Sequence, residues 1–148
     1  MRQRLEQFLD ENYHWSLRLY RTRAGLRALV THDLFDPAAD ATLAVLRSVG
    51  SDPLYVRLCK AQNCFRARLT PKPWRCGHKA NPVRWPMENG DQQARFQRWQ
   101  SRYDAMQSRY ATCRFLETLG NNRVLPEVAR IIEVHDRVTR CEEPLELA

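Results

Sequence analysis

Residues 15–21 alternate between apolar and polar side chains, which is the pattern of a strand with one buried face. Gly25 can adopt the positive φ of a tight turn, and residues 26–31 continue as a second short apolar segment. The pattern predicts an antiparallel hairpin. Because side chains alternate across a strand, we expect Leu17 to face the core and Arg18 to lie on the opposite face.

Apolar residues spaced three or four positions apart predict helices in most of the remaining chain. The predicted helices cover residues 2–13, 38–49, 53–58, 91–119 and 126–138. Asp52 and Pro126 fit the first positions of two of them, because aspartate caps exposed N–H groups and proline has no N–H to satisfy.

Residues 64–70 alternate again, with three apolar side chains on one face and Arg66 and Arg68 on the other. This pattern predicts a third strand whose exposed face is basic. The following segment, residues 71–86, contains four prolines and one glycine. It predicts a long irregular loop, a kind of segment that often carries function.

Together these elements predict an α+β fold, in which a small, mainly antiparallel sheet packs against the long helix of residues 91–119 and flanking helices. A chain of 148 residues fits a single domain. We expect that domain to cover residues 1–141 and to be followed by an acidic C-terminal tail, residues 142–148.

Positive charge is segregated along the chain. Residues 12–31 contain four arginines, residues 53–87 contain eight lysines and arginines, and neither segment contains an acidic residue. The rest of the chain therefore carries a net charge of −5, although the whole chain carries +7. We expect the two segments to fold side by side and to form a positive surface that attracts polyanions.

Candidate phosphate-binding residues lie on the predicted strands and continue into the proline-rich loop. They are Arg18, Arg27, Arg66, Arg68, Lys72 and Arg75. Trp74 lies among them and is expected to stack on an unpaired base, as aromatic side chains do in single-strand binders. These residues favour a noncatalytic polyanion-binding protein with nucleic acid as its ligand. An acidic protein partner is the alternative ligand for the same surface.

Metal binding is a further alternative. Potential zinc ligands are Cys59, Cys64, Cys76 and His78. Their spacing does not match paired Cys-x2-Cys knuckles, so buried free thiols are the simpler interpretation and no cofactor is expected. A metal-dependent phosphoryl-transfer enzyme would use Asp33 and Asp36, which serve equally well as turn residues. The chain contains no nucleophile elbow, Walker loop, dinucleotide fingerprint or His-Glu-x-x-His motif.

The location expected from the sequence is cytoplasmic. No segment approaches the roughly 20 apolar residues that cross a bilayer, and the first residues lack the apolar core of a secretory signal. Five cysteines at irregular spacing do not form the pattern of a secreted disulfide framework, so reduced thiols are expected.

Two segments carry a resemblance to known proteins. Residues 19–27 (Leu-Tyr-Arg-Thr-Arg-Ala-Gly-Leu-Arg) and 65–73 (Phe-Arg-Ala-Arg-Leu-Thr-Pro-Lys-Pro) resemble an uncharacterised bacterial protein family. More remotely, the turn of residues 22–25 is similar to the Thr-x-x-Gly hairpin of the archaeo-eukaryotic primase-polymerase superfamily. The resemblance implies an α+β layout with a basic sheet face toward phosphates. The catalytic acids of that superfamily are spaced by one residue on a strand, whereas the nearest pair here is Asp33-x-x-Asp36.

Overall fold

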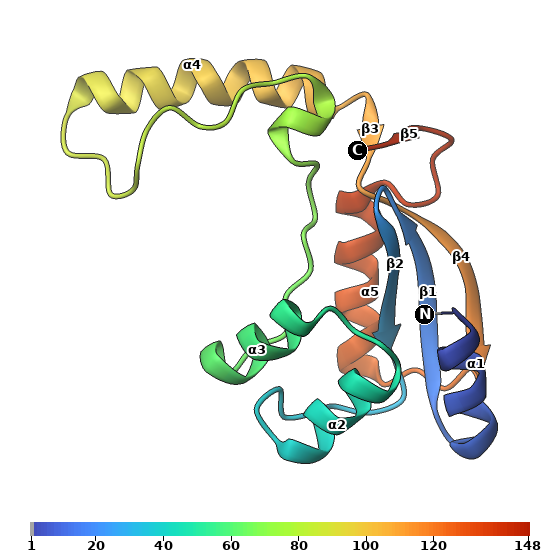
Figure 1. The fold of residues 1–148 in the computed structure, drawn as a ribbon. Helices are drawn as coiled ribbons and strands as arrows, with labels where there is room; N and C mark the ends of the chain where they lie inside the picture. The colour runs from blue at the N-terminus through green and yellow to red at the C-terminus, as the bar shows by residue number, and fades with distance from the viewer. Residues whose placement is uncertain (1) are drawn as a thin grey trace.

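A three-stranded antiparallel sheet lies at the centre of the protein, whose computed structural model describes residues 2–148 (Figure 1). In chain order the elements are α1 (Arg2–Glu11), β1 (Ser16–Thr22), β2 (Gly25–Val30), α2 (Asp40–Ser48), α3 (Pro53–Gln62), the 3-10 turn η1 (Pro73–Cys76), α4 (Gly90–Gln107), β3 (Tyr110–Ala111), β4 (Cys113–Gly120), α5 (Pro126–Thr139) and β5 (Glu146–Leu147). The predicted α+β class is confirmed.

The strands of the main sheet are arranged in the order β2-β1-β4, and both pairings are antiparallel. The predicted hairpin is confirmed, with Thr22 opposite Gly25 at the turn. β4 ends at Gly120, which has a φ of +87° and lies against Trp15. A Cβ atom there would come within 2.0 Å of the Trp15 carbonyl oxygen, so only glycine fits this close approach.

Helices cover both faces of this sheet. On one face, Leu17 and Leu19 of β1 pack with Leu5 of α1 in a buried apolar cluster. On the other face, Tyr20 is fully buried and hydrogen-bonds to α5. The alternation in β1 therefore predicted the two faces correctly. It did not reveal that α5 covers the face that carries Arg18, since that helix lies more than 100 residues further along the chain.

Two of the predicted helix starts are confirmed. Asp52 is the N-cap of α3, and its carboxylate accepts hydrogen bonds from the backbone N–H groups of Leu54 and Tyr55. Pro126 opens α5. α5 is amphipathic, and Val128 and His135 are among its buried residues.

The predicted helix of residues 91–119 is wrong in its second half. α4 ends at Gln107, and residues 113–120 form β4, which pairs with β1. In β4 every second side chain is buried or half-buried, as expected for a strand with one covered face. α4 does not lie on the sheet but projects away from it (Figure 1).

The strand predicted for residues 64–70 is also wrong. This segment, which we call the neck, makes no ladder with any strand and runs from α3 toward η1 (Figure 1). Phe65, expected on the buried face of the strand, is 44% exposed. The alternation was present, but the backbone of the neck forms no ladder with the edge strand β2.

The acidic C-terminal segment folds back onto the protein. Glu146 and Leu147 pair in parallel with Tyr110 and Ala111, and Ala148 is buried. Arg114 donates a hydrogen bond to the carbonyl oxygen of Leu145. Among the described residues, 2–148, none of the helices is long and apolar enough to cross a membrane.

Candidate functional site

Residues 71–109, which we call the arm, form a helix with an irregular segment folded along it (Figure 1). Asn89 caps the start of α4 by accepting a hydrogen bond from the backbone N–H of Gln92. The irregular segment, residues 71–89, contains η1 and then returns along α4 to its first turn. Because the arm projects from the sheet, most of its surface faces solvent.

A stack of aromatic rings holds the irregular segment on α4. The rings of Trp99 and Tyr103 are nearly parallel, with centroids 5.2 Å apart, and His78 lies beside both, stacked on Tyr103 and tilted relative to Trp99. The indole Nε1 of Trp99 donates a hydrogen bond of 2.8 Å to the Lys79 carbonyl oxygen. These aromatic side chains therefore form the core of the arm rather than of the sheet.

The chain enters and leaves the arm at one point. Thr112 Oγ1 donates a hydrogen bond of 2.9 Å to the carbonyl oxygen of Leu69, and the Tyr103 hydroxyl donates one to the carbonyl oxygen of Pro71. Arg27 of β2 also donates a hydrogen bond of 2.8 Å to the carbonyl oxygen of Arg68. These three contacts fix the root of the arm beside the sheet.

The neck and the arm carry the entire net charge of the protein. Residues 64–109 contain ten lysines and arginines but three acidic residues, a net charge of +7. The rest of the chain, residues 1–63 and 110–148, contains fourteen of each and is neutral. The net positive charge therefore lies on one contiguous part of the chain.

The cations of the neck and the arm have no carboxylate partners. The ion pairs formed within residues 2–148 involve Arg2, Arg18, Arg23, Lys60 and Arg140, together with His135, and none of the ten cations of residues 64–109. Side chains without internal partners remain available to an external anion, because no existing ion pair has to be broken first.

Exposed tryptophans accompany these cations. Trp74 in η1 is 62% exposed and Trp85 is 83% exposed, although large aromatic side chains are usually buried. The ammonium group of Lys72 lies 5.3 Å from the ring centre of Trp74. Trp85 was not among the binding residues predicted from the sequence. The feature that could have indicated its exposure is its place between arginine and proline in a loop without apolar periodicity.

The structure divides the predicted phosphate-binding residues into two groups. Arg66 and Arg68 are exposed in the neck, and Lys72, Trp74 and Arg75 lie close together at the start of the arm. Three further arginines, Arg95, Arg98 and Arg102, are exposed on one side of α4. Arg18 and Arg27 lie instead between the sheet and α5.

Arg18 is held by an internal carboxylate. Its Nη2 atom lies 2.6 Å from Oδ2 of Asp136, and its Nε atom donates a hydrogen bond of 2.8 Å to the Tyr20 hydroxyl. The Tyr20 hydroxyl in turn donates to Oδ1 of Asp136 at 2.8 Å. The guanidinium group also packs over the ring of Phe115, 4.0 Å from its centre. The predicted exposed position of Arg18 is therefore wrong.

Arg27 is held by a buried histidine. Its Nη1 atom lies 2.8 Å from Nε2 of His135, and a guanidinium group can only donate, so Nε2 carries no proton. The proton of the ring lies on Nδ1, which donates to Oδ1 of Asp136 at 2.8 Å. His135 is 3% exposed and uses both ring nitrogens within the protein. The neutral ring is thus a structural link between α5 and β2.

Burial and hydrogen bonds shift the pKa values of this cluster. Burial lowers the pKa of His135, and the positive charge of Arg27 lowers it further. The hydrogen bond to Asp136 raises this pKa and offsets part of the shift. Burial by itself would raise the pKa of Asp136, but hydrogen bonds from His135 and Tyr20 and the charge of Arg18 outweigh it, so this pKa is lowered. Burial raises the pKa of Cys141 to about 12, so its thiol is protonated at neutral pH.

The other candidate residues lie apart from one another. Cys59 is buried in α3, whereas Cys76 is buried in the arm, where its Sγ atom contacts the carbonyl oxygen of Pro73. Within residues 2–148 there is no group of three or more His, Cys, Asp or Glu side chains arranged to hold a metal ion. The carboxylates of Asp33 and Asp36 accept hydrogen bonds from backbone N–H groups of their own turns.

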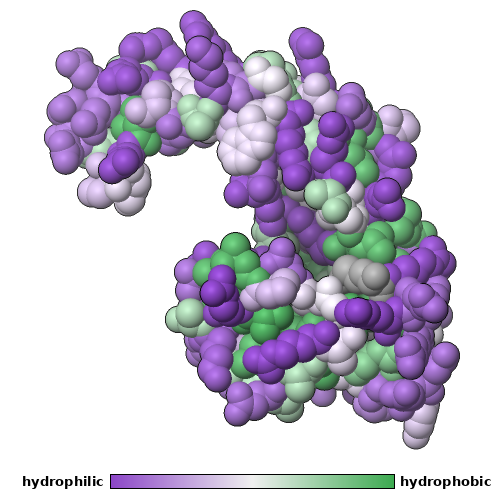
Figure 2. All heavy atoms as spheres, viewed as in Figure 1, coloured by the Kyte–Doolittle hydropathy of each residue, from purple (hydrophilic) through white to green (hydrophobic). Residues whose placement is uncertain are grey.

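The arm overhangs a deep indentation above α3, and its outer surface is largely hydrophilic (Figure 2). The neck forms part of the connection between the two sides of this indentation (Figure 1). In comparisons with known proteins, no family model, curated protein or solved structure matches this chain. The inferences about its function therefore come from the geometry and charge of the neck and the arm.

Proposed function

We propose that this is a noncatalytic protein that binds a polyanion, single-stranded nucleic acid in particular, through its neck and arm. The observation that carries the proposal is that the whole net charge of +7 lies on residues 64–109, without carboxylate partners among residues 2–148. Cationic side chains displace the counterions condensed on phosphates, and this release favours binding.

Exposed tryptophans favour unpaired nucleic acid over an acidic protein. Trp74 adjoins Lys72 and Arg75, so one base could stack on the indole while neighbouring phosphates meet the two cations. An acidic peptide would satisfy the cations but has no flat ring system with which to cover the indole. Arg18 and Arg27 are excluded from this interface because their guanidinium groups are engaged by Asp136 and His135.

The test is the salt dependence of binding to a fluorescent oligo(dT), measured by anisotropy. Log affinity should fall by about 0.7 per phosphate neutralised for each unit of log salt. Contacts from Arg66, Arg68, Lys72 and Arg75 would give a slope of about −3. Absence of binding at low salt, or a flat salt response, would remove the proposal.

Matched variants separate a local interface from the effect of total charge. Lys72→Ala with Arg75→Ala removes two cations of the arm, and Arg47→Ala with Arg130→Ala removes two exposed cations of the neutral remainder. The arm variant should lose affinity and reduce the slope by about 1.4, whereas the control should bind much like the wild type. Equal losses in the two variants would contradict binding through the arm.

A further inference from the structure

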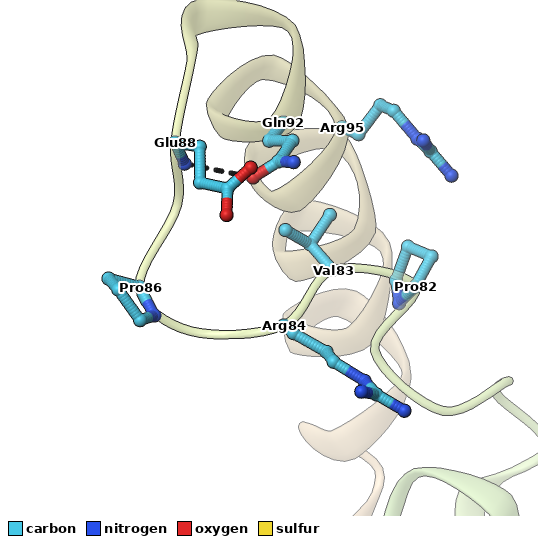
Figure 3. A pocket seen from close by; sticks show the side chains of 7 residues that line it. All are labelled: Pro82, Val83, Arg84, Pro86, Glu88, Gln92 and Arg95. Carbon is cyan, nitrogen blue, oxygen red and sulfur yellow. Dashed lines mark hydrogen bonds between the residues drawn. The ribbon is translucent and has the colours of Figure 1, made fainter.

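A pocket lies at the tip of the arm, between its irregular segment and the first turns of α4 (Figure 3). It has a volume of about 390 Å³, within the range of small-molecule sites. Pro82, Val83 and Pro86 supply its apolar wall, and Val83 points into the space (Figure 3). Such a wall can cover the faces of a planar ring.

The polar wall of the pocket combines hydrogen-bond acceptors on Glu88 with a hydrogen-bond donor on Gln92. The backbone N–H of Glu88 donates to Oε1 of Gln92 at 2.9 Å, which orients the Gln92 amide and leaves its Nε2 group to donate. The Glu88 side-chain carboxylate forms no ion pair within residues 2–148, so both of its oxygens remain available as acceptors. Figure 3 shows this carboxylate directed into the space between the loop and the helix.

Guanine is the base whose edge complements this wall most fully. Its N1–H and N2–H2 groups can donate to the two oxygens of a carboxylate, while its O6 accepts from an amide such as that of Gln92. Adenine and cytosine offer the carboxylate an amino group but no second N–H on the same edge, and thymine places carbonyl oxygens on both sides of its single N–H. A phosphate in the same position would be repelled by Glu88.

We propose that this pocket binds a guanine base bearing a phosphate, the base against Glu88 and Gln92 and the phosphate toward Arg84 and Arg95. The two arginines extend on the side of the pocket away from Pro86 (Figure 3) and have no carboxylate partner among residues 2–148. The inference rests on the proposed function, since it assigns a base preference to the same arm. It adds that the affinity depends on the base sequence of the bound strand.

The experiment compares oligo(dT) strands of one length that carry a single central dG, dA, dC or dT. The strand with dG should bind about tenfold more tightly than the others at constant salt, since one bidentate contact discriminates by roughly that factor. GMP should compete with this strand more effectively than AMP does. Competition by GMP without any preference among the strands would assign the pocket to a free nucleotide instead of a strand.

Glu88→Gln and Asp91→Asn form a matched pair, because each removes one negative charge near the start of α4 and only Glu88 lines the pocket. Glu88→Gln should abolish the guanine preference, and Asp91→Asn should keep it. Salt-dependent binding without base preference and without competition by GMP would overturn the pocket assignment while leaving the proposed function intact. A preference that survives in Glu88→Gln would also overturn it. Failure of every strand to bind would overturn both.

Discussion

His135 is the residue whose protonation state connects two parts of the structure. Its ring accepts a hydrogen bond from Arg27 and donates one to Asp136, an arrangement that requires the neutral form. Arg27 also holds the neck through the carbonyl oxygen of Arg68. A proton on Nε2 would place two positive groups against each other and break the link from α5 through β2 to the neck.

We expect the free energy of unfolding to fall as the pH drops below about 6.5, the ordinary pKa of histidine. The pKa of His135 is lowered in the folded protein, so the unfolded chain binds a proton that the folded chain does not, and stability rises with pH in that window. The groups that face His135 are Asp136 on its own helix, Tyr20 and Arg18 of β1 and Arg27 of β2. The lowered pKa of Asp136 extends the loss of stability to lower pH. Urea unfolding at a series of pH values measures the effect.

The control for this prediction replaces a different histidine. His135→Gln removes the buried titrating group and should flatten the profile between pH 5 and 7, at some cost in stability. His14 is exposed, so His14→Gln should keep the profile of the wild type. A His135→Gln profile as steep as that of the wild type would show that another group is responsible.

At the scale of single residues, the sequence did not reveal the engagement of Arg18 and Arg27. Each pairs with a partner more than 100 residues away, on a helix whose docking face is set by Val128, His135 and Thr139. Residues that act locally were predictable. Asp52 caps the helix that starts immediately after it, and the hairpin forms where the local pattern predicted it, although Gly25 opens β2 and does not adopt the positive φ expected of it.

The elements of the arm show why periodicity alone misplaced one boundary. The apolar spacing of α4 continues through Tyr110 and Cys113, so the pattern predicted a helix to residue 119. Residues 113–120 also alternate, and pairing with β1 selects the strand. In the neck the same alternation yields no strand, because its backbone forms no ladder with the edge strand β2. The deciding factor in both cases is the neighbouring strand, which a local pattern does not contain.

Trp99 is the residue that joins the irregular segment to α4. Trp99→Leu should remove its ring stacking with Tyr103 and its hydrogen bond to Lys79, together about 2 kcal/mol of local stability. Amide hydrogen exchange in residues 77–89 should then be roughly thirtyfold faster, while exchange in the main sheet stays the same.

Trp85→Leu is the matched control for the exchange experiment. Trp85 is 83% exposed and takes part in none of the ring contacts described for α4, so its replacement should leave exchange unchanged. Equal acceleration in both variants, or acceleration in the main sheet after Trp99→Leu, would contradict an independent aromatic core in the arm.

For the whole molecule, the arm behaves as an insertion into an α+β body. Leu69 and Thr112 are joined by a hydrogen bond at its root, so a short glycine-serine linker can replace residues 71–109 without separating the elements on either side. We expect the shortened protein to retain cooperative unfolding and the hairpin register, because the three-stranded sheet, α1 and α5 remain in place. Removal of eight cations and three acids lowers the net charge from +7 to +2.

Two measurements check this excision. Circular dichroism during thermal unfolding should show one transition, and affinity for oligo(dT) at low salt should fall at least tenfold, since Lys72, Trp74 and Arg75 are lost. An unfolded product would show that the body depends on the arm. Undiminished binding by a folded product would place the interface elsewhere.

The separation of a neck and arm that together carry +7 from a neutral remainder also gives the protein a large electric dipole that points along the projection. The electric field of an approaching polyanion should orient this dipole before contact, so in most encounters the arm should be the first part of the protein to meet the polyanion. The association rate constant would then depend on ionic strength more steeply than the dissociation rate constant.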